Sequence, residues 1–543
     1  MIRKVLKLLR IVLKIFLTGL ASALILFGLI YGGFYIDSTI YDRSMKPVRD
    51  PNEIFVNTEF QDSLVRHTQK GEYFLMVKKY VEFMIVNGRD RYGKVHSPLF
   101  ATTLDRNTGN AYGSNPPAAP KGIRERDRTY RGANPANQNG LYSLIYRMSD
   151  ITGDKRYQEE ADKGVEWFFK NCQMPRTNLM SWGEHMGWDF FKERIIYWKF
   201  QFWIHELKGY GHWDRAWQLA REPVEKFSMA LWDHQIYAKD GEKAGEFSRH
   251  ANSIIHYPFS GRGFPSHGGK YIEVWARAWQ ETGNKEYLRA INTLLDYFKR
   301  NTSLESGAIN YATSFPEHYS LGHNMGLASS LYKSMDKLPD TLALRMKLMA
   351  DQTDSIYLSF DHDPSFEGKG FVKYAHVHTL EPGEFRWVHA GGKFRTSMWS
   401  NGYGAGNHIG AGNNCLERYR QTGIEKFKEL FLATAKAYYD ANPPVQKILY
   451  PKNYSGAIGM LRNAYKMTGD RRYLSRAIEY ADISIKELMD ETSPLPKASN
   501  KSDHYEAITG ANGFMGSLLG LWLDLNTVNT DTLIEYSEEE SLK

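Results

Sequence analysis

The chain has 543 residues, of which 42% are hydrophobic and 24% charged, and this composition excludes a mostly disordered protein. Its two cysteines, Cys172 and Cys415, are too few for a disulfide framework or a structural zinc site. A formal charge of +7 would fit a nucleic-acid-binding protein if the basic residues were spread over a folded surface.

The basic residues are instead concentrated at the N-terminus. Residues 1–14 contain five basic residues and no acidic one, and residues 15–36 contain no charged residue at all. About 20 apolar residues span a bilayer, and basic residues before the span favour a cytoplasmic N-terminus. We therefore expect a single-pass signal anchor at 15–36 and not a cleaved signal peptide, with the bulk of the chain in the periplasm or outside the cell. The remainder of the chain is close to neutral, which argues against nucleic acid as a partner.

The rest of the chain divides into three segments. Residues 37–70 have the composition of a polar stalk or a first helix, and residues 528–543 form an acidic tail. We expect residues 71–527 to form one catalytic domain, because no long linker or low-complexity tract interrupts them.

A short internal repeat predicts the architecture of this domain. The sequence Thr-Gly-Asp or Thr-Gly-Asn begins at Thr152, Thr282 and Thr468, and a weaker copy begins at Thr422. Helical periodicity flanks each copy, Gly suits the end of one helix, and Asp or Asn suits the start of the next. The repeats therefore predict an all-α domain of six or seven helical hairpins. We expect an (α/α) toroid and not an open solenoid, because the insertions between the copies are long, polar and aromatic.

These hairpins, set between aromatic-rich loops, resemble the six-hairpin glycosidase superfamily and the related toroidal polysaccharide lyases and sugar epimerases. The resemblance covers most of residues 70–525. It implies a carbohydrate-active protein, but it does not select the reaction, because one fold hosts several chemistries.

Histidine and tryptophan are concentrated in residues 167–279, which hold seven of the 17 histidines and ten of the 13 tryptophans. Within this segment, residues 181–189 place two carboxylates and an imidazole close to two indoles. Indoles can stack on sugars and glycines allow close approach, so we expect a carbohydrate site here, although a buried tryptophan corner would give the same pattern. The candidate residues are Trp182, Glu184, His185, Trp188 and Asp189.

Two further motifs follow in the same segment. Arg249 and His250 are adjacent, and a glycine-rich loop over 261–269 leads into a helix that we expect to begin at Lys270. Such a loop exposes backbone N–H groups that favour an anion. We expect its Arg262 and His267 to contact the substrate.

A fourth polar, glycine-rich region covers residues 395–408 and is typical of a binding loop. Its candidate residues are Arg395, Trp399, Asn401, Tyr403 and His408.

Weaker candidates occur elsewhere. Residues 361–363 and 376–378 could bind a metal, although polar alternation along a surface strand is the favoured explanation. Residues 134–139 could bind sugar hydroxyls or cap a helix. His504 and Glu506 are secondary candidates near the last hairpin.

Among toroidal lyases, the chain resembles the periplasmic pectate lyases in length, in its expected extracytoplasmic location and in one small motif. That family pairs a catalytic Arg with a following metal-binding His, and Arg249-His250 matches the pair. The resemblance implies a divalent cation, Mn or Ca, bound by Glu184, His185 and His250. The chain departs from the family because no His precedes Glu184 at the family's spacing, so His185 or His267 would have to replace it.

A uronan lyase needs a base and a group that neutralises the substrate carboxylate. Arg has a pKa above 12 and normally stays protonated. An alternative therefore leaves Arg249 to hold the carboxylate and assigns the base to His250, His408 or Tyr403.

Hydrolysis is the competing reaction, and it needs two carboxyl groups on either side of the glycosidic bond. Glu184 and Asp189 are the first pair, with Asp127 or Glu506 in reserve. A sugar epimerase and a non-catalytic glycan-binding envelope protein are further alternatives. In each case the expected partner is a polysaccharide or oligosaccharide, which for a lyase contains uronate.

Overall fold

A computed structural model of the chain describes the following residues: 71–183, 186–196, 203–205, 212–252, 263–310, 315–383, 394–401, 406–444 and 446–526. For 203–205 and 250–252 it describes the backbone alone.

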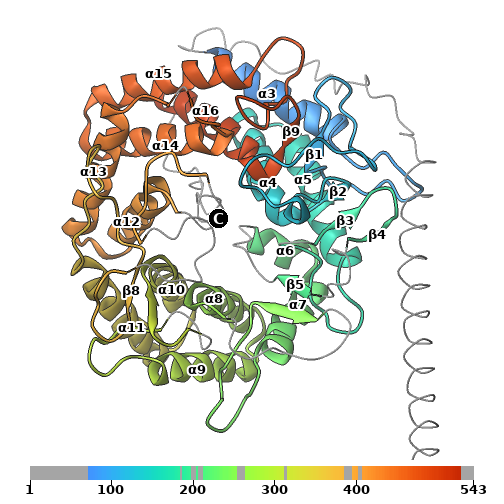
Figure 1. Ribbon diagram of the computed structural model, residues 1–543. Coiled ribbons are helices and arrows are strands. Elements are labelled where there is room, and N and C mark those ends of the chain that lie inside the picture. The colour runs from blue at the N-terminus through green and yellow to red at the C-terminus, as the bar shows by residue number, and fades with distance from the viewer. Residues whose placement is uncertain are drawn as a thin grey trace, which may run out of the picture.

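The described residues are mostly helical (Figure 1). The helices are α3 (Gly71–Val86), α4 (Pro135–Thr152), α5 (Lys155–Asn171), α6 (Trp213–Leu219), α7 (Arg221–Ala230), α8 (Pro265–Thr282), α9 (Lys285–Arg300), α10 (Leu321–Ser334), α11 (Asp340–Leu358), α12 (His408–Thr422), α13 (Glu425–Asp440), α14 (Pro451–Thr468), α15 (Arg471–Leu488) and α16 (Ala511–Leu525). The short strands are β1 (Thr103–Leu104), β2 (Gly132–Ala133), β3 (Trp188–Asp189), β4 (Arg194–Ile195), β5 (Trp203–His205), β6 (His250–Asn252), β7 (His318–Ser320), β8 (Tyr374–His376) and β9 (Tyr505–Glu506).

The Thr-Gly-Asp repeats form the turns of helical hairpins, as predicted. In each copy the first helix ends at the threonine, and the glycine adopts a left-handed backbone with φ between 67° and 72°. Asp154, Asn284 and Asp470 then cap the next helix by accepting a hydrogen bond from a backbone N–H two residues on. In the weaker copy, Ile424 occupies the cap position and provides no side-chain cap. These turns pair α4 with α5, α8 with α9, α12 with α13 and α14 with α15.

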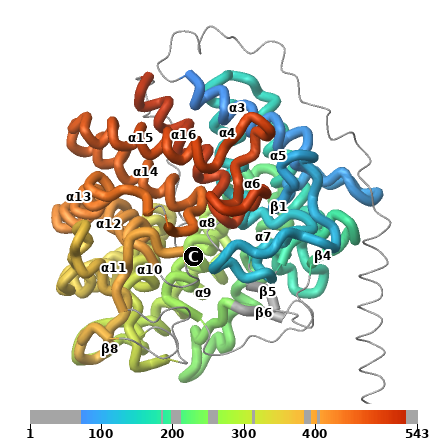
Figure 2. Tube along the Cα trace, turned by 45° about the horizontal axis from the view of Figure 1, so that its top comes forward, coloured from blue at the N-terminus to red at the C-terminus, as the bar shows by residue number. Residues whose placement is uncertain are grey.

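The hairpins follow one another around a ring (Figure 1). One helix of each pair contacts its neighbour on the inner side, in the order α8, α10, α12, α14, α16 and α4. Helices α5, α6 and α7 connect α4 to α8. The ring closes where α16 packs against α3 and α4, which brings the first and last described helices side by side (Figures 1 and 2). This arrangement agrees with the predicted all-α ring of hairpins.

Small antiparallel sheets lie at one end of the ring. β2, β7 and β9 come shortly before the inner helices α4, α10 and α16, and they pair with β3, β8 and β1. Each inner helix before α16 is followed by a helix that returns in the opposite direction, so the inner helices share one direction. The loops and sheets before them therefore gather at their N-terminal ends, where the predicted site motifs also lie in the sequence.

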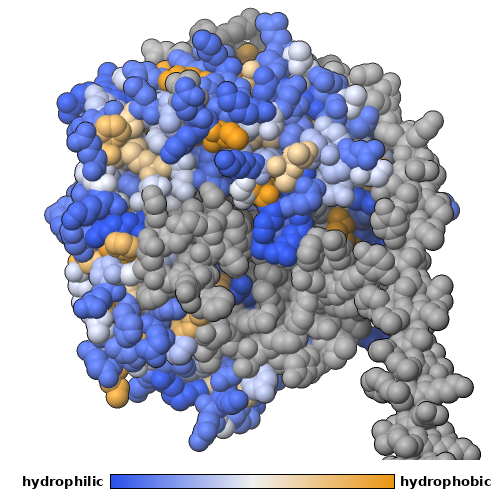
Figure 3. Space-filling model, viewed as in Figure 1, coloured by the Kyte–Doolittle hydropathy of each residue, from blue (hydrophilic) through white to orange (hydrophobic). Residues whose placement is uncertain are grey.

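A single apolar cluster fills the space between the inner and outer helices, and it includes Trp182, Trp232, Trp275 and Trp522. The face seen in Figure 3 is mostly hydrophilic in the part that the structure describes, with scattered apolar side chains. Cys172 and Cys415 are both buried, and neither forms a disulfide.

Several predicted segments fall outside the described residues. They are the basic segment 1–14, the anchor 15–36, the stalk 37–70 and the acidic tail 528–543. None of the helices that the structure does describe has the length and apolar character needed to cross a membrane.

Candidate active site

Arg249 lies in a cluster of rings at the N-terminal ends of α8 and α10. The Cζ atom of Arg249 is 4.1 Å from the centroid of the Phe264 ring, and Phe264 directly precedes α8. His323, from the first turn of α10, places its ring 4.6 Å from that of Phe264. Its Nδ1 atom is 2.7 Å from Ser266 Oγ, and its ring is 6.3 Å from that of His267. The structure thus brings Arg249 and His267 together with three residues that the sequence did not indicate.

Glycines allow α8 and α10 to approach closely enough to build this cluster. A Cβ atom on Gly326 would lie 2.9 Å from Ser266 Cβ, and one on Gly269 would lie 2.8 Å from Ser330 Cβ. This packing also corrects a prediction, because α8 begins at Pro265 and not at Lys270. Gly268 and Gly269 lie inside the helix, where they admit neighbouring side chains, and they do not form an anion-binding loop.

The electrostatics of the cluster favour an uncharged His323 beside the Arg249 guanidinium. Burial and the nearby charge of Arg249 lower the pKa of His323 to about 3. The imidazole of His323 is therefore uncharged at neutral pH. The inner helices also direct their N-terminal ends, which carry partial positive charge, toward this side of the ring. The arrangement suits a negatively charged group such as a sugar carboxylate.

Several predicted residues fall outside the described positions. They are Glu184, His185, Arg262 and Tyr403, and for His250 only the backbone is described, in β6. The predicted metal ligands Glu184, His185 and His250 therefore have no described side chains. Within the described ranges, no group of three His, Cys, Asp or Glu side chains is arranged to hold a metal ion.

Asp189 has a structural role, which corrects its assignment as a hydrolytic carboxylate. It is 5% exposed, and one oxygen accepts hydrogen bonds from the backbone N–H groups of Phe191 and Lys192 at 2.9 and 3.0 Å. The other oxygen is 3.1 Å from Arg131 Nε. Burial raises the pKa of Asp189, and the charge of Arg131 opposes that effect. Because both oxygens are engaged, the carboxylate secures the β2–β3–β4 sheet.

Trp182 and Trp188 are core residues and not platforms for a sugar. Trp182 is 2% exposed, and its indole stacks on Phe168 at 5.5 Å and meets Trp213 edge-on at 5.9 Å. Trp188 is 9% exposed and packs edge-on against Trp167. The sequence motif is thus the buried tryptophan corner that was the alternative explanation.

The 395–408 region forms a second structural unit. Arg395 donates hydrogen bonds to the carbonyl oxygens of Asp361 and Gly370, at 2.8 and 3.0 Å, so its guanidinium ties loops together. Asn401 Nδ2 donates to the Ile448 carbonyl at 2.9 Å. Both side chains therefore hold loops together, and their substrate-binding roles stay predictions.

Trp399 and His408 are also buried. Trp399 is 8% exposed and packs between the rings of Tyr438 and Tyr480, at 5.2 and 6.0 Å. His408 is 3% exposed at the start of α12, and its Nδ1 is 3.0 Å from Thr396 Oγ1. Burial lowers the pKa of His408 to about 4.

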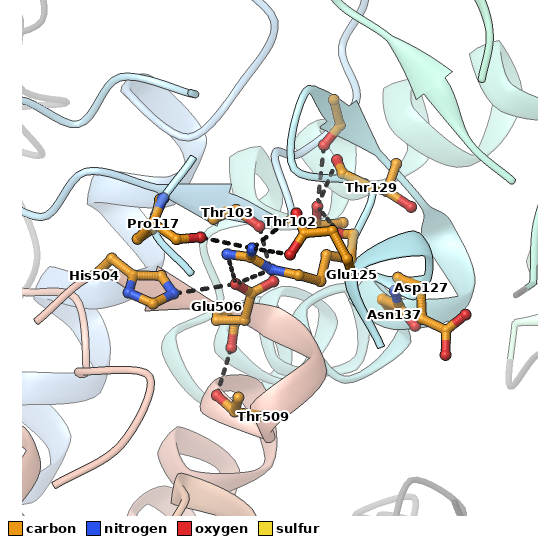
Figure 4. Close-up of polar contacts among 12 residues, drawn as sticks. Thr102, Thr103, Pro117, Glu125, Asp127, Thr129, Asn137, His504, Glu506 and Thr509 are labelled. Atoms are coloured by element: carbon orange, nitrogen blue, oxygen red, sulfur yellow. Dashed lines mark hydrogen bonds and ion pairs between the residues drawn. The ribbon is translucent and has the colours of Figure 1, made fainter. Parts of the chain in front are cut away.

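Glu506 belongs to a fully buried ion pair that closes the ring (Figure 4). Its carboxylate accepts hydrogen bonds from Arg128 Nε and Nη2 at 2.9 and 2.7 Å and from Thr103 Oγ1 at 2.8 Å, and it lies 3.1 Å from His504 Nε2. The side chains of Arg128 and Glu506 are both 0% exposed. Arg128 also reaches the Pro117 carbonyl at 2.7 Å. This set of partners makes Glu506 and His504 structural, which corrects their place among the catalytic candidates.

Asp127 and the 134–139 segment support the start of α4. Asp127 is buried, its carboxylate pairs with Arg124 Nε at 2.6 Å, and its carbonyl accepts from Asn137 Nδ2. Asn134 caps the helix, and Pro135 is its first residue. The helix-capping explanation of this segment is therefore correct.

The histidines of the two possible metal motifs, 361–363 and 376–378, contact other groups of the protein. His362 Nε2 donates to the Tyr357 carbonyl at 3.0 Å, and its Nδ1 accepts from the Val372 N–H at 3.1 Å. Both ring nitrogens are therefore committed to the backbone.

The other motif lies on the β7–β8 sheet. His376 is 3.4 Å from Glu317 and His378 is 3.0 Å from Glu305, and these carboxylates are exposed. Surface polar pairing accounts for both histidines.

Ser266 lies within the 261–269 motif but was not among the predicted site residues, and His323 was not predicted at all. His323 lies inside a regular helical pattern, and its relation to Arg249 depends on the contact between two helices. The one local signal is the pair Gly322 and Gly326, whose spacing marks a helix face with room for a close neighbour.

Residues 97–308 match the family described as "Periplasmic pectate lyase". This segment is similar to periplasmic pectate lyases. The similarity covers less than half of the chain, and it includes Arg249, His250, Phe264, Ser266 and His267. The matched segment therefore resembles a family of carbohydrate-active enzymes.

Three solved structures show a distant similarity to this chain. A D-mannose isomerase has a TM-score of 0.44 at 10% identity and covers 85% of this chain and 98% of its own. An unsaturated glucuronyl hydrolase specific for heparin has a TM-score of 0.43 at 10% identity, with coverage of 87% and 100%. The cellobiose 2-epimerase of Bacillus thermoamylovorans B4167 has a TM-score of 0.41 at 8% identity, with coverage of 86% and 100%.

Proposed function

We propose that the protein is an extracytoplasmic polysaccharide lyase that cleaves a uronate-containing glycan by β-elimination. The observation that supports this function best is the match of residues 97–308 to periplasmic pectate lyases, within which Arg249 and His250 reproduce the Arg-His pair of that family. The position of Arg249 beside aromatic and imidazole rings, at the N-terminal ends of the inner helices, supports the same function.

The chemistry assigns a role to each kind of group. In β-elimination a base removes the proton next to the sugar carboxylate, and negative charge develops on that carboxylate. A C=C bond then forms as the C–O bond to the neighbouring sugar breaks, and the leaving oxygen takes a proton from an acid or from water. Arg249 would hold the carboxylate and stabilise the developing charge, because a guanidinium matches a carboxylate in shape and charge. His250, His408 and Tyr403 were the predicted bases. Burial of His408 leaves His250 and Tyr403 as the bases in this proposal.

A divalent cation, Mn or Ca, at Glu184, His185 and His250 is part of the proposal. When bound, it would neutralise the substrate carboxylate together with Arg249. His250 would then hold the metal, which leaves Tyr403 as the base.

Hydrolysis finds less support. The predicted pair needs a free carboxylate on each side of the bond, and Asp189 is held by Arg131 and by two backbone N–H groups.

The decisive experiment measures the product. The full-length protein is incubated with polygalacturonate and with other uronans, while ultraviolet absorbance of the unsaturated product and new reducing ends are followed together. We expect both signals to rise, and we expect Arg249→Ala to abolish them while Ser330→Ala, at the same α8–α10 interface, retains them. New reducing ends without absorbance would establish a hydrolase and overturn the proposal.

The location is proposed on sequence grounds. A signal anchor at 15–36 would place the ring in the periplasm or outside the cell. Protease added to the outside of spheroplasts should digest the ring, and complete protection there would exclude this topology.

A further inference from the structure

Phe264 is the point at which three separate segments meet. Its ring contacts the guanidinium of Arg249, which precedes β6, and the imidazole of His323, which comes from α10. Phe264 also lies 5.6 Å from the ring of His267. A guanidinium over an aromatic face is held by both charge and packing. The position of the Phe264 ring therefore sets the position of the Arg249 side chain.

His323 is in turn fixed by its own surroundings. Ser266 Oγ lies 2.7 Å from Nδ1 of the imidazole, and Ser266 is in the first turn of α8. Gly326 lies one helical turn after His323 and lets α10 approach Ser266. The imidazole is thus anchored to α8 at one end and packed on Phe264 at its face.

We propose that His323 is a positioning residue for Arg249. Acting through the ring of Phe264, it fixes the guanidinium where an anionic sugar would bind. An uncharged imidazole suits this position better than a charged one. A second cation beside Arg249 would repel it and would compete for the same carboxylate, whereas a neutral ring packs against Phe264 and does neither. The effect on catalysis rests on the proposed lyase function, but the effect on the position of Arg249 does not.

The first test is a double-mutant cycle on uronan cleavage. His323→Ala removes the ring that supports Phe264, and a misplacement of about 1 Å can cost on the order of 100-fold in rate. We expect kcat/KM to fall at least about tenfold in His323→Ala, and His323→Phe, which keeps a ring on Phe264, to recover most of the loss. In an Arg249→Lys background, His323→Ala should change kcat/KM by less than about twofold, because its effect passes through Arg249.

Independent effects of the two substitutions, multiplying in the double variant, would overturn the proposal. Ser330→Ala is the matched control, because Ser330 lies at the same α8–α10 interface beside Gly269, two helical turns after His323. It should leave kcat and KM near the wild-type values.

The second test needs no catalytic activity. The rate at which phenylglyoxal modifies Arg249 is measured by peptide mass spectrometry, with Arg395 as internal reference. We expect faster modification of Arg249 in His323→Ala and in Phe264→Ala, and no change in Ser330→Ala. An unchanged rate in His323→Ala would refute the positioning role. If the wild-type protein cleaves no uronan and yet the rate changes, the lyase function fails and the positioning role stands.

Discussion

The buried ion pair between Arg128 and Glu506 should control closure of the ring. Arg128→Met leaves the Glu506 carboxylate in the interior with Thr103 and His504 and without its two hydrogen bonds from the guanidinium. Removing one partner of a fully buried pair typically costs about 3–5 kcal/mol, because an uncompensated charge stays buried. The additional contact of Arg128 with Glu125 adds little, since that carboxylate is 53% exposed.

The assay combines urea unfolding with hydrogen exchange. We expect Arg128→Met to lose about 3–5 kcal/mol of unfolding free energy, and the double variant Arg128→Met/Glu506→Leu to lose less than the single one, because no buried charge remains. Exchange protection should fall first in α3 and α16.

The matched control is Arg418→Met, which breaks the equally buried pair with Asp354 between α11 and α12. It should cost a similar free energy but expose α11 and α12 first. The reasoning would be refuted if Arg128→Met lost less than about 1 kcal/mol, or if the double variant were as unstable as the single one.

Other predictions follow from local features. His408 has its pKa lowered from 6.5 to about 4, so the native state binds fewer protons than the unfolded state, and stability falls as the pH drops from 6.5 toward 4. The loss is about 3 kcal/mol, and urea unfolding of His408→Gln at pH 7 and pH 4.5 should show a smaller difference than the wild type. Asp470→Ala should cost about 1 kcal/mol through loss of the α15 cap, with Arg471→Ala as the neutral control. Gly326→Val should lower the thermal midpoint, because its side chain meets Ser266, whereas Gly322→Ala, with no atom in reach, should not. A chelator should reduce uronan cleavage and added Mn or Ca should restore it, and unchanged activity would remove the metal from the proposal.

The sequence was sufficient for features that depend on neighbouring residues. The Thr-Gly-Asp turns were predicted correctly because a left-handed glycine and an N-cap are local requirements. The all-α hairpin architecture followed from them.

Features that depend on contacts between distant segments were not predictable in the same way. Trp182 and Trp188 carry the same composition signal in a core as in a sugar platform, and only packing separates the two. Gly268 and Gly269 predicted a loop, but they lie in a helix, where the missing side chains leave room for neighbouring residues. The position of His323 beside Ser266 depends on the packing of α10 against α8, which the local sequence does not determine.

Closure of the ring also has a consequence for biosynthesis. Tyr80 meets Tyr505 across 425 positions in the chain, and its hydroxyl donates to Asn512 Oδ1 at 2.6 Å. At ~5–20 residues per second, a ribosome needs on the order of 20–80 s to make the intervening chain. Throughout that interval the apolar side of α3 lacks its final partner α16. The nascent protein must therefore keep its first helix from aggregating until its last one arrives, and chaperone binding should concentrate on α3 during synthesis.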